Sequence, residues 1–241
     1  MNTPIRIHVE HAIAALCPRL SIRTVESLVA NGPTPSALWD EIAILSAQLR
    51  QSFTVETLKQ RSGIAATRQA YKACGKDPSR YRPSCEQLAR RVLQGKELYS
   101  INSLVDLGNL LSLSSGYSVG VLDADKISGR ELSLGIGQID EPYEAIGRGT
   151  LNIEGMPVYR DALGAVATPT SDSVRTQIDE RTKHVLIIIN GYDGDGENLD
   201  NAVRMAERLV EEYAGGKSKN YLRDILKYLG PCLRSCSTIR N

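Results

Sequence analysis

Three polar side chains share one face of a predicted helix near the middle of the chain. Asn102, Asp106 and Asn109 occupy positions i, i+4 and i+7 of a leucine-rich stretch, and side chains at this spacing stack on one face of a helix. Buried amide and carboxylate groups need hydrogen-bond partners. The pattern therefore predicts either a pocket wall that donates and accepts hydrogen bonds, or side chains that satisfy nearby backbone groups and cap a loop.

Two carboxylates follow a short apolar strand that we predict at residues 119–122. Asp123 and Asp125 end this run and precede Lys126. They could orient an ammonium group, or they could shape the turn before the lysine. No histidine or cysteine lies close enough in the sequence to complete a metal site. We therefore expect no metal here, and nothing in the chain indicates a cofactor.

Hydroxyl and carboxylate groups also gather in the last third of the sequence. Thr170, Ser171 and Asp172 precede Arg175 at the start of a short helix predicted within residues 172–180. These residue types cap helices, and helix N-terminal N–H groups beside an arginine also bind phosphate or carboxylate. Asp172 is the candidate catalytic residue, because a carboxylate can hold water against an ester carbonyl. Binding is favoured here over proton transfer.

Cationic and aromatic side chains interleave between residues 68 and 91. This composition suits contact with a nucleic-acid backbone and stacking on an unpaired end, and it equally suits a solvated helix face and loop. The net charge of +1 allows only a weak or local contact. The candidate RNA-binding residues are Arg68, Tyr71, Lys72, Lys76, Arg80 and Arg82.

The bulk composition is that of a soluble globular protein. The 241 residues are 41% hydrophobic and 24% charged, and no apolar run approaches the roughly 20 residues of a membrane span. The N-terminus lacks the pattern of a signal peptide, so we interpret it as mature protein. The five cysteines are an odd, scattered set, which favours reduced thiols in the cytoplasm over a disulfide framework.

Hydrophobic periodicity predicts an α+β fold, in which a helical N-terminal half packs on a mixed or antiparallel sheet with C-terminal helices. We expect residues 1–62 to form a strand-and-helix region packed on a main domain of residues 63–241. A capping box is predicted at Ser84 and Gln87. The helices are predicted at 36–51, 55–61, 64–73, 84–95, 202–213 and 221–229. The strands are predicted at 4–9, 119–122, 132–135, 143–146, 150–153, 156–159, 165–167 and 184–190.

The ordered set of motifs resembles the tRNA-binding and editing domain of the bacterial phenylalanyl-tRNA synthetase β subunit, built from its third and fourth modules. Free-standing versions of that domain are more similar still, and the likeness covers more than half of the chain. The motifs that carry it are Arg68, Tyr71 and Lys72; Gly75–Pro78; Arg82–Ser84; Asn102, Val105, Asp106 and Asn109; Gly116, Asp123, Asp125 and Lys126; and Thr170–Thr176.

The resemblance implies a pocket for the aminoacylated end of a tRNA, because the synthetase domain removes tyrosine wrongly attached to phenylalanine tRNA. Two departures concern catalysis. Gly120 stands where the family has an editing histidine, and Asp172 lies where the family has a glutamate. The substrate-binding residues predicted to converge on one cavity are Asn102, Asp106, Asn109, Gly120, Asp123, Thr170, Ser171, Asp172 and Arg175.

Two functions follow as expectations. One is an RNA-binding protein that binds the aminoacylated end of tRNA, with hydrolysis of a mischarged ester left open. The alternative is a module that binds a free amino acid or related metabolite, without RNA or catalysis. The chain shows no synthetase catalytic core, so we do not expect it to charge tRNA. The sequence does not fix the oligomeric state.

Overall fold

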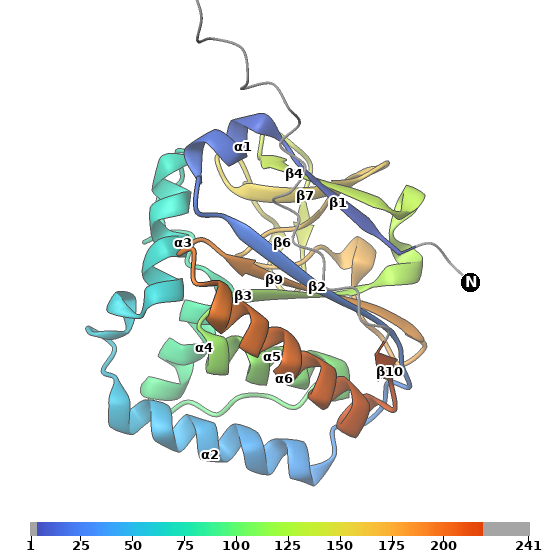
Figure 1. The fold of residues 1–241 in the computed structure, drawn as a ribbon. Coiled ribbons are helices and arrows are strands. Elements are labelled where there is room, and N and C mark those ends of the chain that lie inside the picture. The colour runs from blue at the N-terminus through green and yellow to red at the C-terminus, as the bar shows by residue number, and fades with distance from the viewer. Residues whose placement is uncertain (1–3, 219–241) are drawn as a thin grey trace, which may run out of the picture.

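The computed structural model describes residues 4–218, which form an α+β fold with two four-stranded sheets packed face to face (Figure 1). The first sheet has the order β1 (Arg6–Val9), β4 (Glu131–Ile136), β7 (Pro157–Asp161) and β8 (Gly164–Ala167). The second has the order β10 (Lys217–Ser218), β2 (Ser21–Leu28), β9 (His184–Gly191) and β3 (Ser118–Asp123). A small hairpin joins β5 (Glu144–Ala145) to β6 (Gly149–Thr150).

Helices cover the outer face of the second sheet. In Figure 1, α5 and α6 lie directly against this sheet, and α2 lies outside α5. The helices are α1 (His11–Leu16), α2 (Ser36–Ser52), α3 (Ser62–Ala73), α4 (Ser84–Leu93), α5 (Ser103–Ser115) and α6 (Gly196–Ala214). None of the helices within residues 4–218 has the length and hydropathy that a membrane span requires.

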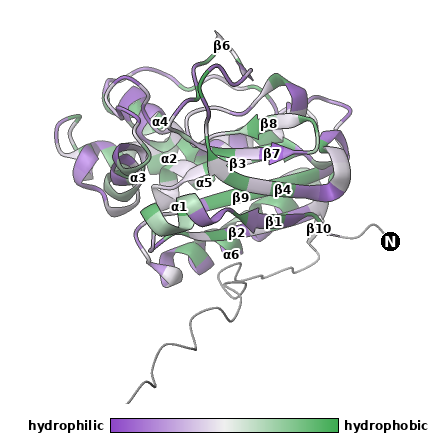
Figure 2. Ribbon diagram, turned by 90° about the horizontal axis from the view of Figure 1, so that it is seen from above, coloured by the Kyte–Doolittle hydropathy of each residue, from purple (hydrophilic) through white to green (hydrophobic). Residues whose placement is uncertain are grey.

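Strand β9 forms the centre of the molecule because it is buried on both faces. Val185, Ile187 and Ile189 pack against α5 and α6, whereas Leu186 and Ile188 pack against the first sheet. Side chains alternate along a strand, so a strand between two layers must be apolar at every position. Figure 2 shows this strand between its neighbours in largely hydrophobic colour. The prediction of a buried strand at 184–190 is confirmed.

Residues before position 62 enter both sheets. Strand β1 pairs in parallel with β4, and β2 pairs antiparallel with β9 along its whole length. The sequence left residues 11–31 unassigned, and the structure fills them with α1 and β2. The N-terminal half therefore combines its helices with the predicted strand β1 and with β2, which the sequence analysis did not predict.

Local differences from the sequence predictions have local causes. Residues 55–61 form turns and a short 3-10 helix at Leu58–Gln60, and the helix predicted within 172–180 shrinks to Val174–Thr176. The predicted capping box is wrong: the helix begins at Ser84 itself, and the Gln87 amide donates instead to the Arg82 carbonyl at 2.6 Å. The helix predicted at 221–229 lies outside the described residues.

Candidate functional site

A pocket of about 300 Å³ opens where α4, α5 and β3 meet the turn after β8. We call it the β3-edge pocket. Its volume is at the lower end of the range for small-ligand sites, and eight of its twelve lining residues carry hydroxyl, amide or charged groups. The lining residues are Ser84, Gln87, Leu88, Gly108, Asn109, Ser112, Val119, Ile146, Arg148, Thr170, Ser171 and Asp172.

The Asp172 carboxylate lies on the free edge of the second sheet. Strand β3 is the outer strand of that sheet, so its outward N–H groups need partners from elsewhere. The Val121 N–H donates to Asp172 Oδ2 at 3.2 Å. A Cβ on Gly120 would lie only 3.3 Å from Asp172 Oδ1, so the missing side chain makes room for the carboxylate. Gly120 and Asp172, the two residues at which the chain departs from the family pattern, are therefore in contact.

Buried hydroxyls fix the turn that carries Asp172. Thr168 Oγ1 accepts from the N–H groups of Thr170 and Ser171, each at 3.2 Å. The Tyr71 hydroxyl shares a hydrogen bond of 2.8 Å with Thr170 Oγ1, and the Tyr143 hydroxyl donates to the Ser171 carbonyl at 2.7 Å. These bonds hold the turn in one conformation and set the position of the carboxylate at its end.

Burial raises the pKa of the Asp172 carboxyl to about 7, and the Val121 N–H opposes this shift only in part. The cause is loss of hydration, which disfavours the charged form. The same carboxylate contributes, after burial itself, to the raised pKa of Tyr143. A carboxyl group that titrates near neutrality is suited to accept a proton from water in a reaction.

A smaller cavity lies on another side of Asp172. It measures about 10 Å³ and is lined in part by Ser118, Tyr159, Thr168 and Asn190, which is about the space that one water molecule needs. The Tyr159 hydroxyl donates to Asn190 Oδ1 at 2.5 Å, and Asn190 Nδ2 donates to the Ser118 carbonyl at 3.2 Å. Asp172 therefore separates an open polar pocket from a water-sized polar cavity.

Five of the predicted substrate-binding residues meet at this place. Asn109, Thr170, Ser171 and Asp172 line the β3-edge pocket, and Gly120 lines the small cavity behind it. They come from α5, β3 and the turn after β8, the three segments that the sequence predicted to converge.

Asn102 and Asp106 lie elsewhere, at the N-terminal end of α5. Asn102 is the N-cap residue, and its Oδ1 accepts from the Val105 N–H at 3.0 Å. Asp106 accepts from the hydroxyls of Thr34 at 2.5 Å and Ser100 at 3.2 Å. Neither side chain lines the pocket, because Asn102 precedes the helix and both residues are held by local partners at its N-terminal end, nearer the helix start than Asn109.

Asp123 and Arg175 are also held by partners away from the pocket. Asp123 Oδ2 accepts from the Thr182 hydroxyl at 2.8 Å and lies 3.4 Å from Lys126 Nζ. Arg175 forms an ion pair of 2.9 Å with Asp161, whose carboxylate side chain is completely buried. Both residues support the loops that surround the site.

Half of the predicted RNA-binding residues are engaged inside the protein. The Tyr71 ring is fully buried, so it presents no face to a base. Lys76 is buried too; its Nζ donates to the Asn152 carbonyl at 2.8 Å and lies 3.9 Å from the centre of the Tyr81 ring. Arg68 is bound to Glu86 at 2.8 Å. The exposed members of the set are Lys72, Arg80 and Arg82.

The structure adds pocket residues that the sequence reasoning missed. Ser112 follows Asn109 by one helical turn, and this i+3 spacing was the signal that could have found it. Arg148 reaches the pocket from the β5–β6 hairpin and hydrogen-bonds the Gln87 side chain. No pattern in the neighbouring sequence predicts that Arg148 lies at the pocket. Within residues 4–218, no three histidine, cysteine, aspartate or glutamate side chains are grouped as a metal site.

Comparison with known proteins adds a family to this geometry. The profile of the family described as the B3/4 domain matches residues 66–215, more than half of the chain. Among solved structures, an N-terminal fragment of the phenylalanyl-tRNA synthetase β subunit from Pyrococcus horikoshii aligns at 14% identity with a TM-score of 0.46. The alignment covers 90% of this chain and 51% of that fragment, so the chain spans about half of its length. No curated protein matches. The chain therefore belongs to the B3/4 domain family.

Proposed function

We propose that the β3-edge pocket binds the aminoacylated end of a tRNA and hydrolyses the ester of a wrongly attached amino acid. The observation that carries this proposal is the Asp172 carboxyl, which lies in a hydroxyl-rich pocket, has a pKa of about 7 and accepts from one donor within the described part of the chain. Membership of the B3/4 family supports it. The reaction belongs to the cytoplasm, where tRNA is charged.

The chemistry needs a base, a water and donors for the carbonyl oxygen. Ionised Asp172 takes a proton from water, and the resulting hydroxide attacks the ester carbonyl carbon. The bond to the ribose oxygen then breaks, and the ribose oxygen takes up the proton from Asp172. The amino acid leaves as a carboxylic acid, which loses its remaining proton to solvent and becomes a carboxylate. The Asn109 amide and the hydroxyls of Thr170 and Ser171 are the pocket donors available to the developing oxyanion. No step requires a metal.

The RNA contact that we propose is local. Lys72, Arg80 and Arg82 are exposed, and Arg148 lies at the pocket itself. A small number of cations gives weak, salt-sensitive binding to the phosphate backbone, which agrees with the net charge of +1. The pocket, rather than the charge of the whole surface, would then select the aminoacylated end.

The test is release of labelled amino acid from a panel of mischarged and correctly charged tRNAs. We expect the unaltered protein to deacylate at least one mischarged tRNA, and Asp172→Asn to lose that activity. Asp140→Asn is the matched control, since Asp140 is an exposed carboxylate whose φ of 54° asparagine also tolerates. No release above the uncatalysed rate for any tRNA would refute the hydrolytic proposal.

The alternative is binding of a free amino acid or related metabolite in the same pocket without RNA. The internal engagement of Arg68, Tyr71 and Lys76 favours it, because these groups are not free to contact phosphate or bases. The two functions differ in their salt response. Binding of tRNA in a gel shift should weaken steeply with salt, whereas a metabolite should raise the melting temperature whether or not tRNA is present.

A further inference from the structure

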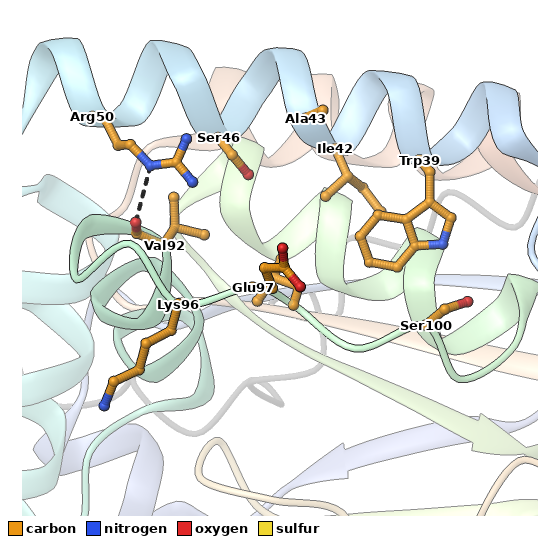
Figure 3. Close-up of a pocket in the computed structure, with 10 residues that line it drawn as sticks. Trp39, Ile42, Ala43, Ser46, Arg50, Val92, Lys96, Glu97 and Ser100 are labelled. Carbon is orange, nitrogen blue, oxygen red and sulfur yellow. Dashed lines mark hydrogen bonds between the residues drawn. The ribbon is translucent and has the colours of Figure 1, made fainter.

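A second concavity, of about 440 Å³, lies between α2 and the segment that joins α4 to α5 (Figure 3). We call it the α2 groove. It shares no lining residue with the β3-edge pocket. Its wall on the α2 side presents Trp39, Ile42 and Ser46, and Leu98 belongs to the opposite wall. The proposed function makes no use of this groove.

Charges of opposite sign lie along the groove. The Arg50 Nε donates to the Val92 carbonyl at 3.2 Å, which orients the guanidinium, and its two terminal nitrogens bind no described residue. The Glu97 carboxylate has no ion-pair or hydrogen-bond partner among residues 4–218 either. In the view of Figure 3, Glu97 lies between Arg50 and Trp39, whereas the Lys96 ammonium points away from them. The order is therefore cation, anion and aromatic surface.

A serine hydroxyl also faces the groove and bonds no other described residue. Ser46 is only 6% exposed, and its side chain points from α2 into the space drawn in Figure 3. A helical serine commonly bonds back to a carbonyl of the preceding turn, as Ser115 does with Leu111 at 2.8 Å. Ser46 makes no hydrogen bond to any described residue. The Ser46 hydroxyl is therefore available to hydrogen-bond a ligand in the groove.

We infer that the α2 groove is a binding site for a free α-amino acid with an apolar side chain. Its carboxylate would meet the Arg50 guanidinium, its ammonium would meet Glu97, and its side chain would pack on Trp39 and Leu98. Charged hydrogen bonds of this kind are stronger than neutral ones. A nucleotide fits less well, because Glu97 repels phosphate at the centre of the groove.

The chain provides its own reporter for this site, since Trp39 is the only tryptophan. The experiment titrates the full-length protein with L-leucine and follows Trp39 fluorescence. We expect a saturable change. Leucinamide lacks the carboxylate and 4-methylpentanoate lacks the ammonium, so each should bind at least about tenfold more weakly, the effect of losing one charged hydrogen bond.

Two substitutions test which charged group of the ligand Arg50 and Glu97 each bind. Arg50→Gln should remove the preference for leucine over leucinamide, and Glu97→Gln should remove the preference over 4-methylpentanoate. Both residues are exposed on the surface, so these changes leave the core intact. A melting curve of each variant checks that the fold is retained.

The proposal for the α2 groove and the proposal for the β3-edge pocket can be tested independently. Asp172→Asn should leave the response of Trp39 to leucine unchanged, and Arg50→Gln should leave tRNA deacylation unchanged. The inference is overturned if leucine produces no saturable signal, or if both analogues bind as well as leucine. It is also overturned if leucine raises the melting temperature equally in the Arg50→Gln variant while Trp39 does not respond, because the amino acid then binds elsewhere.

Discussion

Asp106 and Asp172 are two carboxylates in different surroundings, the first buried and the second half-buried at the edge of a pocket. Asp106, at the start of α5, is 1% exposed and accepts from Thr34, Ser100 and the Ile101 N–H. Asp172, at the edge of β3, accepts from the Val121 N–H and from no other group of residues 4–218. Burial raises the pKa of both carboxyls, but hydrogen bonds to the charged form offset more of that effect at Asp106.

The number of donors separates a structural carboxylate from a reactive one. At Asp106 the surrounding hydroxyls and N–H group satisfy the acceptor oxygens, so the group ties the loop before α5 to the loop before α2. At Asp172 the Oδ1 atom meets no donor among the described residues, and it lies at a polar pocket. The sequence pattern alone gives no reason to assign different roles to Asp106 and Asp172. The following predictions test whether they differ as the structure indicates.

The largest expected effect is on deacylation by Asp172→Asn. Asparagine keeps the shape but cannot take a proton from water, so the rate should fall by about 10²- to 10⁴-fold, the usual contribution of a general base. Single-turnover release of labelled amino acid measures this. The Asp140→Asn control should keep the full rate. A rate for Asp172→Asn within a few-fold of the unaltered protein would mean that the carboxylate only positions the turn.

The second effect is on stability, and it should be larger at Asp106. Asp106→Ala leaves two hydroxyls and one N–H without their acceptor, which should lower the free energy of unfolding by about 2 kcal/mol. Asp172→Ala removes the acceptor of one N–H and relieves the burial of a charge, so it should cost less. Urea unfolding at pH 8 compares them. Equal losses would contradict the assigned roles.

Much of the fold could be predicted because its signals are local. The apolar run of β9, the period of α2 and the Asn102 cap of α5 each depend on neighbouring residues. The position of Asp172 on β3 is not local, since it requires the strand order that leaves β3 at the edge. The resemblance brought Gly120 and Asp172 into consideration separately, and only the structure shows their contact.

The predicted binding residues that the structure places elsewhere are also explained by contacts that are distant in the sequence. Tyr71 and Lys76 belong to a stretch whose composition suits a surface, yet the loop after α3 folds back and buries both. Arg175 looked available beside a helix start, and the buried Asp161 takes it instead. In each case a partner distant in sequence decided the role, and no spacing rule contains that partner.

The third prediction concerns pH. In the folded protein the pKa of Asp172 is raised from the ordinary 3.8 to about 7, so between these values the native state binds more protons than the unfolded state. The contribution of Asp172 to the free energy of unfolding is therefore greatest at the acid end of this range and is lost as the pH rises through about 7. Asp172→Asn should abolish this slope. Urea unfolding at pH 5 and pH 8 measures it, and parallel behaviour of the two proteins would show that Asp172 does not titrate there.

The smallest effect is expected from a single methyl group at Gly120. In Gly120→Ala the new Cβ would lie 3.3 Å from Asp172 Oδ1, which is tight enough to displace the carboxylate by a few tenths of an ångström. The strain should cost about 1 kcal/mol of stability, and deacylation should fall by about tenfold because the base is misplaced. Gly196→Ala is the control, since its Cβ meets nothing within 4 Å. If Gly120→Ala and Gly196→Ala behave alike in both assays, the close approach of Asp172 to β3 is not what sets its reactivity, and the difference from Asp106 must have another cause.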